Sequence, residues 1–93
     1  MYYVYVLYSK KLNKRYIGYC ADLKRRLRYH NSGNSKFTSK GVPWNLVFYE
    51  AFISKKDAVR EEKFLKSGSG RKRLEYLLEN TMNLIKWRGA GVD

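Results

Sequence analysis

Three side chains in one short segment have the types and the spacing needed to act on a phosphate. Asp22, Arg26 and His30 are four residues apart in "DLKRRLRYHN", so in a helix they would lie along one side. A guanidinium at the edge of a buried face can bind two phosphate oxygens and stabilise a pentavalent transition state. The same spacing also permits structural roles: Arg26 could pair with Asp22, and His30 could interact with the dipole at the helix end.

A second segment contributes a carboxylate that needs a partner. In "SKKDAVREEKFLK", Glu62 follows Ala58 and precedes Leu65 at helical spacing, while Glu61 is expected to lie with the lysines. Because an unpaired charge is costly to bury, we expect Glu62 to contact a divalent cation or, as a structural alternative, an arginine.

Two tyrosines and a glycine complete the set of candidates. Tyr5 and Tyr16 lie in two strand-like segments that can pair. A phenol, whose ordinary pKa is about 10, acts as a general base when nearby positive charge stabilises the phenolate. Gly18 follows in the second segment, where glycine often marks a close approach of the backbone to a ligand. Ordinary core packing is the alternative for both tyrosines.

The charge balance indicates a polyanionic partner. The 93 residues contain 20 Lys and Arg against 8 Asp and Glu, a formal net charge of +12. Such a chain attracts nucleic acid, acidic membranes or acidic proteins. Charge alone does not choose among these partners.

Cysteine content and hydropathy bear on the compartment. The single cysteine, Cys20, excludes an intrachain disulfide and is expected to be a small buried residue. Lysines interrupt the apolar N-terminus early, so we expect no signal peptide. No apolar run approaches the length of a membrane span. We therefore expect a cytoplasmic protein, or a nuclear one in a eukaryote, without a membrane partner.

The first half of the chain is expected to form a hairpin and a helix. Residues 2–9 and 15–20 are rich in β-branched and aromatic residues, and Asn13 lies in the turn between them. Asp22 can cap a helix that carries Leu23 and Leu27 on its buried side. Asn and Gly in the segment 31–33 would end that helix.

The second half is expected to add one strand and two helices. A polar loop, 32–44, precedes a strand over 44–53. Ser54, with Asp57 three residues later, predicts the start of a second helix, which would run to Lys66 and break at "SGSG". A third helix would bury Leu74, Leu77 and Leu78. From Thr81 we expect a short strand or an extended arm.

These elements predict an α+β fold, a small three-stranded antiparallel sheet flanked by helices, in the order strand, strand, helix, strand, helix, helix. We expect one domain over 1–93, with its core in 2–66 and an extension in 67–93.

Two basic segments could grip a nucleic-acid backbone. "SGSGRKR" (67–73) has cations at the start of a helix, where free amides suit a phosphate, although it could equally be a cap and a solvated turn. "KFTSK" (36–40) could track a strand or be an ordinary exposed loop. The candidate nucleic-acid contacts are Gly18, Arg25, Lys36, Lys40, Lys63, Arg71, Lys72 and Arg73.

Taken in order, "YVY" at 3–5, "YIG" at 16–18, "DLKRRLRYHN" and "AVREEKFLK" resemble the GIY-YIG nuclease superfamily over residues 2–66. The first motif departs from its namesake, because Tyr3 and Val4 replace glycine and isoleucine. The resemblance implies the fold expected above. It also implies catalytic roles for Tyr5, Tyr16, Arg26, His30 and Glu62.

The implied reaction is hydrolysis of a phosphodiester with one Mg²⁺ or Mn²⁺ ion bound by Glu62. Water would attack, its proton would pass to Tyr16 or Tyr5, and Arg26 would bind the phosphate. A C-terminal asparagine, Asn80 or Asn83, could complete the site.

DNA is favoured over RNA as the substrate, with structural or low sequence specificity. A protein partner or a second copy of the chain could supply further specificity. The alternatives are a nucleic-acid-binding module without catalysis and an RNA- or ribosome-associated basic protein.

Overall fold

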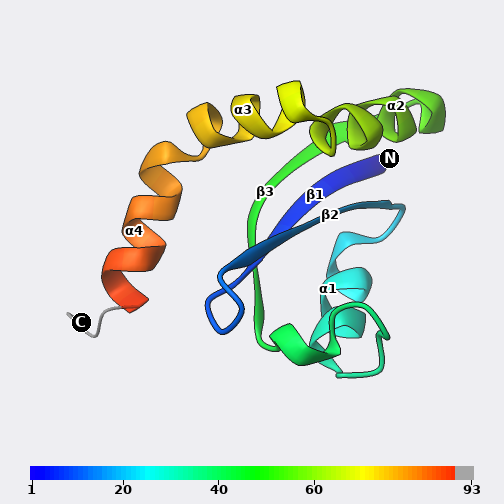
Figure 1. Cartoon of the computed structure of the whole chain (residues 1–93). Coiled ribbons are helices and arrows are strands. Elements are labelled where there is room, and N and C mark those ends of the chain that lie inside the picture. Colours follow the sequence, from blue (N-terminus) through cyan, green and yellow to red (C-terminus); the bar gives the residue numbers. More distant parts are fainter. Residues whose placement is uncertain (90–93) are drawn as a thin grey trace.

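A three-stranded antiparallel sheet organises the part of the chain that the structure, a computed structural model, describes, residues 1–89 (Figure 1). The strand order is β2-β1-β3, so both neighbours of the central strand are edge strands. The strands are β1 (Tyr2–Ser9), β2 (Lys14–Cys20) and β3 (Trp44–Phe52). The predicted sheet is confirmed.

The β1–β2 hairpin sets the register of the site. Its turn is stabilised at Asn13, which has a φ of 52° and accepts a hydrogen bond from Tyr8 Oη at 2.6 Å. Asparagine tolerates this left-handed conformation better than most residues. In the resulting ladder, Tyr5 lies opposite Gly18 and Leu7 lies opposite Tyr16. Tyr5 and Tyr16 are therefore diagonal neighbours on one face of the sheet.

Alternation along β1 gives the sheet two buried faces. Tyr5 and Leu7 face α1 (Leu23–Asn31), with Leu23 and Leu27 packed against them. Val4 and Val6 face the opposite side, which α2 (Lys55–Leu65) and α3 (Gly68–Leu77) cover. Figure 1 shows α1 and α2 on opposite sides of the sheet, with the end of β2 between them.

Short polar side chains start the helices as the sequence predicts. Asp22 accepts a hydrogen bond from the Arg25 amide at 3.0 Å, and Ser54 accepts one from the Asp57 amide at 3.4 Å. Such caps satisfy amides that have no partner within the helix.

The predicted break at "SGSG" is narrower than expected. Only Lys66 and Ser67 separate α2 from α3, and both glycines of the segment lie in the first turn of α3. A side chain at Gly70 would overlap the backbone of Phe64 and Leu65. Glycine therefore lets α3 begin directly against the end of α2.

The C-terminal segment corrects the sequence prediction. The chain from Glu79 to Gly89 is a fourth helix, α4, in place of a short strand or extended arm. The Met82 amide donates to the Leu78 carbonyl at 2.7 Å, and Met82 packs on the core of the α2 face. Leu74 and Leu78 are buried, whereas Leu77, expected on the same stripe, is 38% exposed.

The loop after α1 contains a short 3₁₀ helix, η1 (Ser39–Gly41). In the described part of the chain, every helix is too short or too polar to cross a membrane.

Candidate active site

Tyr5 lies at the centre of the candidate site. Its side chain is 2% exposed, and its hydroxyl is hydrogen-bonded to His30 Nε2 at 2.9 Å. Gly18 makes this position possible, because a Cβ at Gly18 would lie 2.5 Å from Tyr5 Oη. The space above Gly18 is therefore filled by the phenol of Tyr5, although the sequence suggested a ligand there.

His30 connects Tyr5 to the loop after α1. Its Nδ1 is hydrogen-bonded to Thr38 Oγ1 at 2.8 Å, so both ring nitrogens have partners. Burial, together with the charge of Arg26, lowers the pKa of His30 below its ordinary value. The imidazole is therefore neutral at pH 7, with one donor and one acceptor nitrogen. This differs from a charged histidine that interacts with the end of a helix.

Tyr16 completes an aromatic cluster with these residues. Its ring centroid lies 4.8 Å from that of His30 and 6.3 Å from that of Tyr5. Tyr16 is half-buried, whereas Tyr5 and His30 are buried. Tyr16 is thus the most exposed member of the cluster.

The loop that carries Thr38 is fixed by Trp44 and Asn31. The Trp44 indole donates to the Thr38 carbonyl at 2.7 Å. The Trp44 amide donates to Asn31 Oδ1 at 2.6 Å, and Asn31 Nδ2 donates to the Trp44 carbonyl at 3.0 Å. Sequence reasoning missed these supporting residues, since no local pattern distinguishes Thr38 from its polar neighbours.

Burial decides the protonation state of Tyr5. Loss of solvent contact raises the pKa of this phenol well above its ordinary value, and the charges of Tyr16 and Glu62 act in the same direction. Arg26 lowers the pKa of Tyr5, but by less. The sequence suggested that positive surroundings would stabilise a phenolate, and at Tyr5 desolvation outweighs that effect. Tyr5 therefore keeps its proton at neutral pH.

Arg26 borders the cluster with its guanidinium accessible. The side chain is exposed, and its guanidinium carbon lies 5.9 Å from the ring centroid of Tyr29. The positive charge of Arg26 lowers the pKa of Tyr5, Cys20 and His30. The ion pair with Asp22 that the spacing permits is absent from the described side chains.

A cavity of about 460 Å³ lies beside Arg26. Its lining combines the end of β2, the start of α1 and one exposed aromatic ring, and consists of Cys20, Ala21, Asp22, Arg25, Arg26 and Tyr29. This cavity is large enough for a phosphate group and is open to the Arg26 guanidinium.

Glu62 approaches from the other side of the sheet. Its side chain is 15% exposed, and its Oε2 lies 3.1 Å from Lys66 Nζ. The partner is therefore Lys66, the residue that caps the C-terminal end of α2, in place of the expected cation or arginine. The charge of Glu62 also contributes to the raised pKa of Tyr5, although less than burial or the charges of Tyr16, Arg26 and Cys20. In Figure 1 the end of the edge strand β2 lies between α1, which carries Arg26, and α2, which carries Glu62.

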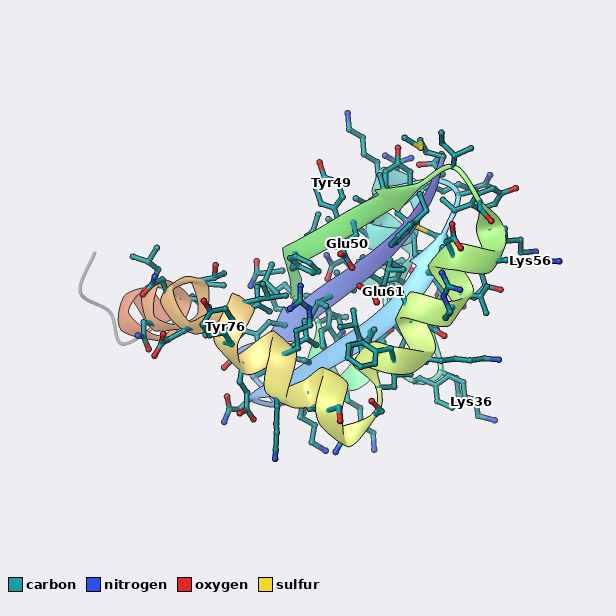
Figure 2. All side chains as sticks on the ribbon, turned by 90° about the horizontal axis from the view of Figure 1, so that it is seen from above. Lys36, Tyr49, Glu50, Lys56, Glu61 and Tyr76 are labelled. Carbon is teal, nitrogen blue, oxygen red and sulfur yellow. The ribbon has the colours of Figure 1, made fainter. Side chains whose placement is uncertain are left out.

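The prediction that Glu61 lies with the exposed lysines of its helix is wrong. It is half-buried and faces Glu50 of β3 (Figure 2). Burial, followed by the hydrogen bond and charge of Glu61, raises the pKa of Glu50 to about 7, and Arg73 acts in the opposite direction. This carboxyl pair lies on the α2 face, opposite the tyrosine cluster.

The donor atoms near Tyr5 suit a weakly held hard cation. Among the described residues, no three His, Cys, Asp or Glu side chains gather into a metal site. Glu62 is the carboxylate that acts on the cluster. Mg²⁺ commonly keeps several waters and takes one or two carboxylates plus substrate phosphates. A single glutamate therefore fits Mg²⁺ or Mn²⁺ and does not fit a closed structural site.

The predicted asparagines lie on α4. Asn80 is exposed. Asn83 lines a cavity of about 360 Å³ with Tyr8, Asn13 and Arg15, among others. Tyr5, Tyr16 and His30 do not line this cavity, so Asn83 lies apart from the cluster.

The predicted basic contacts are divided among several surfaces. Arg25 lines the cavity beside Arg26, and Arg71 lines a different cavity. The remaining five are exposed on the loop after α1, on α2 and on α3, namely Lys36, Lys40, Lys63, Lys72 and Arg73. Figure 2 shows Lys36 directed away from the body of the protein.

The fold has clear counterparts among known proteins. The family model described as the GIY-YIG catalytic domain matches residues 1–75. The chain therefore belongs to the GIY-YIG catalytic domain family. Nucleases of this family generally use a divalent metal ion, and the family implies a nucleic-acid substrate.

Within that family, the chain is similar to proteins named UPF0213. It is 39% identical over 87 residues to a UPF0213 protein of Streptococcus pneumoniae, covering 91% of this chain and 87% of the relative. It is 36% identical over 90 residues to one of Limosilactobacillus reuteri, covering 94% and 93%. The solution NMR structure of a UPF0213 protein from Bacillus halodurans matches with a TM-score of 0.52 and 38% identity, covering 83% of this chain and 85% of that one.

Proposed function

We propose that this protein is a metal-dependent endonuclease that hydrolyses phosphodiester bonds in nucleic acid. The observation that carries the proposal is the convergence at β2 of one guanidinium, one carboxylate and a hydrogen-bonded tyrosine–histidine pair. Arg26 and Glu62 come from helices on opposite faces of the sheet, yet the charges of both act on Tyr5. Such a set of groups can bind a phosphate and can accept or donate a proton beside it.

Arg26 would bind the nonbridging oxygens of the scissile phosphate. Its guanidinium is exposed and free of the two ion pairs among the described side chains, so it can fork onto two oxygens. Charge that develops on those oxygens in the transition state would be stabilised there.

Tyr16 is the better candidate for general base. The raised pKa of Tyr5 makes that phenol a hydrogen-bond donor at neutral pH. Tyr16 is half-exposed and lies against neutral His30, and could accept a proton from the attacking water. Tyr5 and His30 would hold Tyr16 in position, and Thr38 would orient His30.

Glu62 would hold the divalent cation. When bound, the cation would neutralise charge on the scissile phosphate and the leaving oxygen. For this, the Glu62 carboxylate must exchange Lys66 for the ion. At 52% exposure, the Lys66 side chain has room to leave.

The test is a cleavage assay with Mg²⁺ or Mn²⁺ on branched, flapped and single-stranded DNA and on RNA. We expect wild type to nick DNA that contains branches or flaps. Arg26→Ala and Glu62→Ala are each expected to abolish cleavage while nucleic-acid binding persists. Arg60→Ala is the matched control, because Arg60 is exposed on α2 and pairs with Asp57. Cleavage by either active-site variant at the wild-type rate would refute the catalytic roles of Arg26 and Glu62.

A non-catalytic nucleic-acid-binding module is the second candidate. The ion pair between Lys66 and Glu62 favours it, because a lysine already occupies the carboxylate. Binding without cleavage across all four substrate classes would support this function in place of the first. We further propose a cytoplasmic location, DNA in preference to RNA, and specificity for structure over sequence.

A further inference from the structure

A third cavity, of about 490 Å³, lies on the α2 side of β2. Four of its lining residues carry a positive charge, and the complete lining is Lys14, Arg15, Ile17, Lys66, Arg71 and Leu74. The cations come from three separate elements: the start of β2, the end of α2 and the first turns of α3. This cluster is therefore a product of the tertiary fold; the neighbouring basic run in the sequence contributes only Arg71.

The apolar floor of the cavity holds these elements in place. Leu74 is fully buried in the core, and Ile17 packs against the same core. Arg71 lies one helical turn before Leu74, so its backbone is fixed by α3. The ladder pairs Lys14 with Ser9 and Arg15 with Tyr8, which fixes the other wall.

The cavity carries unneutralised positive charge. No carboxylate is among its lining residues. Lys66 pairs with Glu62, and the described side chains offer no ion pair to Lys14, Arg15 or Arg71. Like charges gathered at a partly enclosed surface repel one another and attract an anion. A ligand with several negative charges would relieve this repulsion.

Lys66 joins the cavity to the candidate active site. Lys66 is one of the lining residues, and its Nζ lies 3.1 Å from Glu62 Oε2. On the other wall, Arg15 and Ile17 alternate along β2 with Tyr16 and Gly18 of the site. The cavity and the candidate active site therefore lie next to each other, on the two faces of the same edge strand.

We propose that this cavity binds backbone phosphates of the substrate strand next to the phosphate that is cut. The inference rests on the proposed function for the identity of the strand. Four cations from three elements match consecutive phosphodiesters better than a single small anion. Each phosphate contact of this kind releases counterions, so the cavity should contribute directly to the salt dependence of binding.

The experiment measures binding by fluorescence anisotropy with short fluorescein-labelled oligonucleotides, one single-stranded and one hairpin duplex, in EDTA. Titrations run from about 50 to 200 mM NaCl, the range over which such contacts weaken strongly. The variant is Lys14→Ala/Arg71→Ala. Its log K against log[NaCl] slope should be shallower than that of wild type by roughly 1.4 on the single strand or 1.8 on the duplex, the values for two lost contacts.

The matched control is Lys55→Ala/Lys56→Ala, which removes the same charge from exposed positions at the start of α2. We expect its slope to stay close to wild type. An equal change in both double variants, or no change in the cavity variant, would overturn the proposal. Lys14→Gln, at the exposed end of β2, is the second variant in case the double substitution unfolds the chain. Its slope should be shallower by roughly 0.7–0.9.

The outcome is separable from that of the proposed function because binding in EDTA needs no catalysis. A shallower slope in the cavity variant supports the phosphate subsite even if wild type cleaves nothing. An unchanged slope removes the subsite even if wild type cleaves DNA.

Discussion

Gly18→Ala tests the packing on which the candidate site depends. The methyl group would lie 2.5 Å from Tyr5 Oη, 2.7 Å from Cζ and 3.1 Å from Cε2. Non-bonded carbon atoms pack at about 3.5–4.0 Å, so the phenol or the strand must move by about 1 Å. Tyr5 is 2% exposed and has no open side toward which to move.

The cost has two parts. Overpacking of a well-packed core costs about 1–3 kcal/mol. The hydrogen bond between Tyr5 and His30 is 2.9 Å long, and a shift of about 1 Å would take it out of range and remove about 1 kcal/mol. Together these terms reduce the free energy of unfolding by about 2–4 kcal/mol. For a domain of this size, the midpoint of thermal unfolding should fall by about 8–30 °C.

Thermal and urea unfolding followed by circular dichroism would measure the change. Gly68→Ala is the matched control, since nothing lies within 4 Å of a Cβ at that position. There, alanine should be neutral or stabilising by about 0.5–1 kcal/mol, because Gly68 lies in the first turn of α3.

A second substitution identifies the atom responsible. Tyr5→Phe removes Oη, the atom closest to the added methyl group. Tyr5→Phe should therefore lower the free energy of unfolding by about 1 kcal/mol less in the Gly18→Ala protein than in wild type. Unchanged stability of Gly18→Ala, or strictly additive effects of the two changes, would refute the reasoning.

Two further predictions concern titratable groups. Tyr16→Phe should slow cleavage by about 100-fold or more, the scale of losing a general base, while nucleic-acid binding stays the same; an unchanged single-turnover rate would exclude Tyr16 as the base. Glu50 has a pKa raised to about 7 in the folded protein, through burial and Glu61. Its neutral form is the one that the fold favours, so its contribution to stability is complete below about pH 4.5 and is lost as pH rises to about 7. The resulting decrease in the free energy of unfolding between these pH values is about 1 kcal/mol after allowing for solvent screening. Glu50→Gln should abolish this decrease, and urea unfolding at several pH values would detect the difference from wild type. If Glu50→Gln and wild type showed the same dependence of stability on pH, the pKa of Glu50 would be ordinary despite its neighbours Glu61 and Arg73.

Local patterns were sufficient for most of the elements. The alternation of apolar and aromatic residues in β1 and β2 specifies a hairpin, and the caps at Asp22 and Ser54 appear in the structure where the sequence predicts them. A capping side chain and the amide that it satisfies are three residues apart. The necessary information is therefore contiguous in the chain.

Helix α4 shows where local reasoning fails. "MNLIKW" has no strong helical periodicity, and its helix is supported where Met82 meets the core under α2 and α3. The prediction for Glu61 was wrong for a related reason. Its neighbours in sequence are charged, but β3 brings Glu50 opposite to it. A contact between distant segments leaves no trace in either local pattern.

For the candidate site too, local sequence predicts some properties and the tertiary structure decides others. The types of its residues, two phenols, a guanidinium, an imidazole and a carboxylate, are readable from the chain, and so is the pairing of the two strands that carry Tyr5 and Tyr16. Their ionisation is not readable, because the raised pKa of Tyr5 and the lowered pKa of His30 come chiefly from burial by other segments. Desolvation depends on everything that packs around a group, so it exists only once the sheet, α1 and the loop with Thr38 have come together.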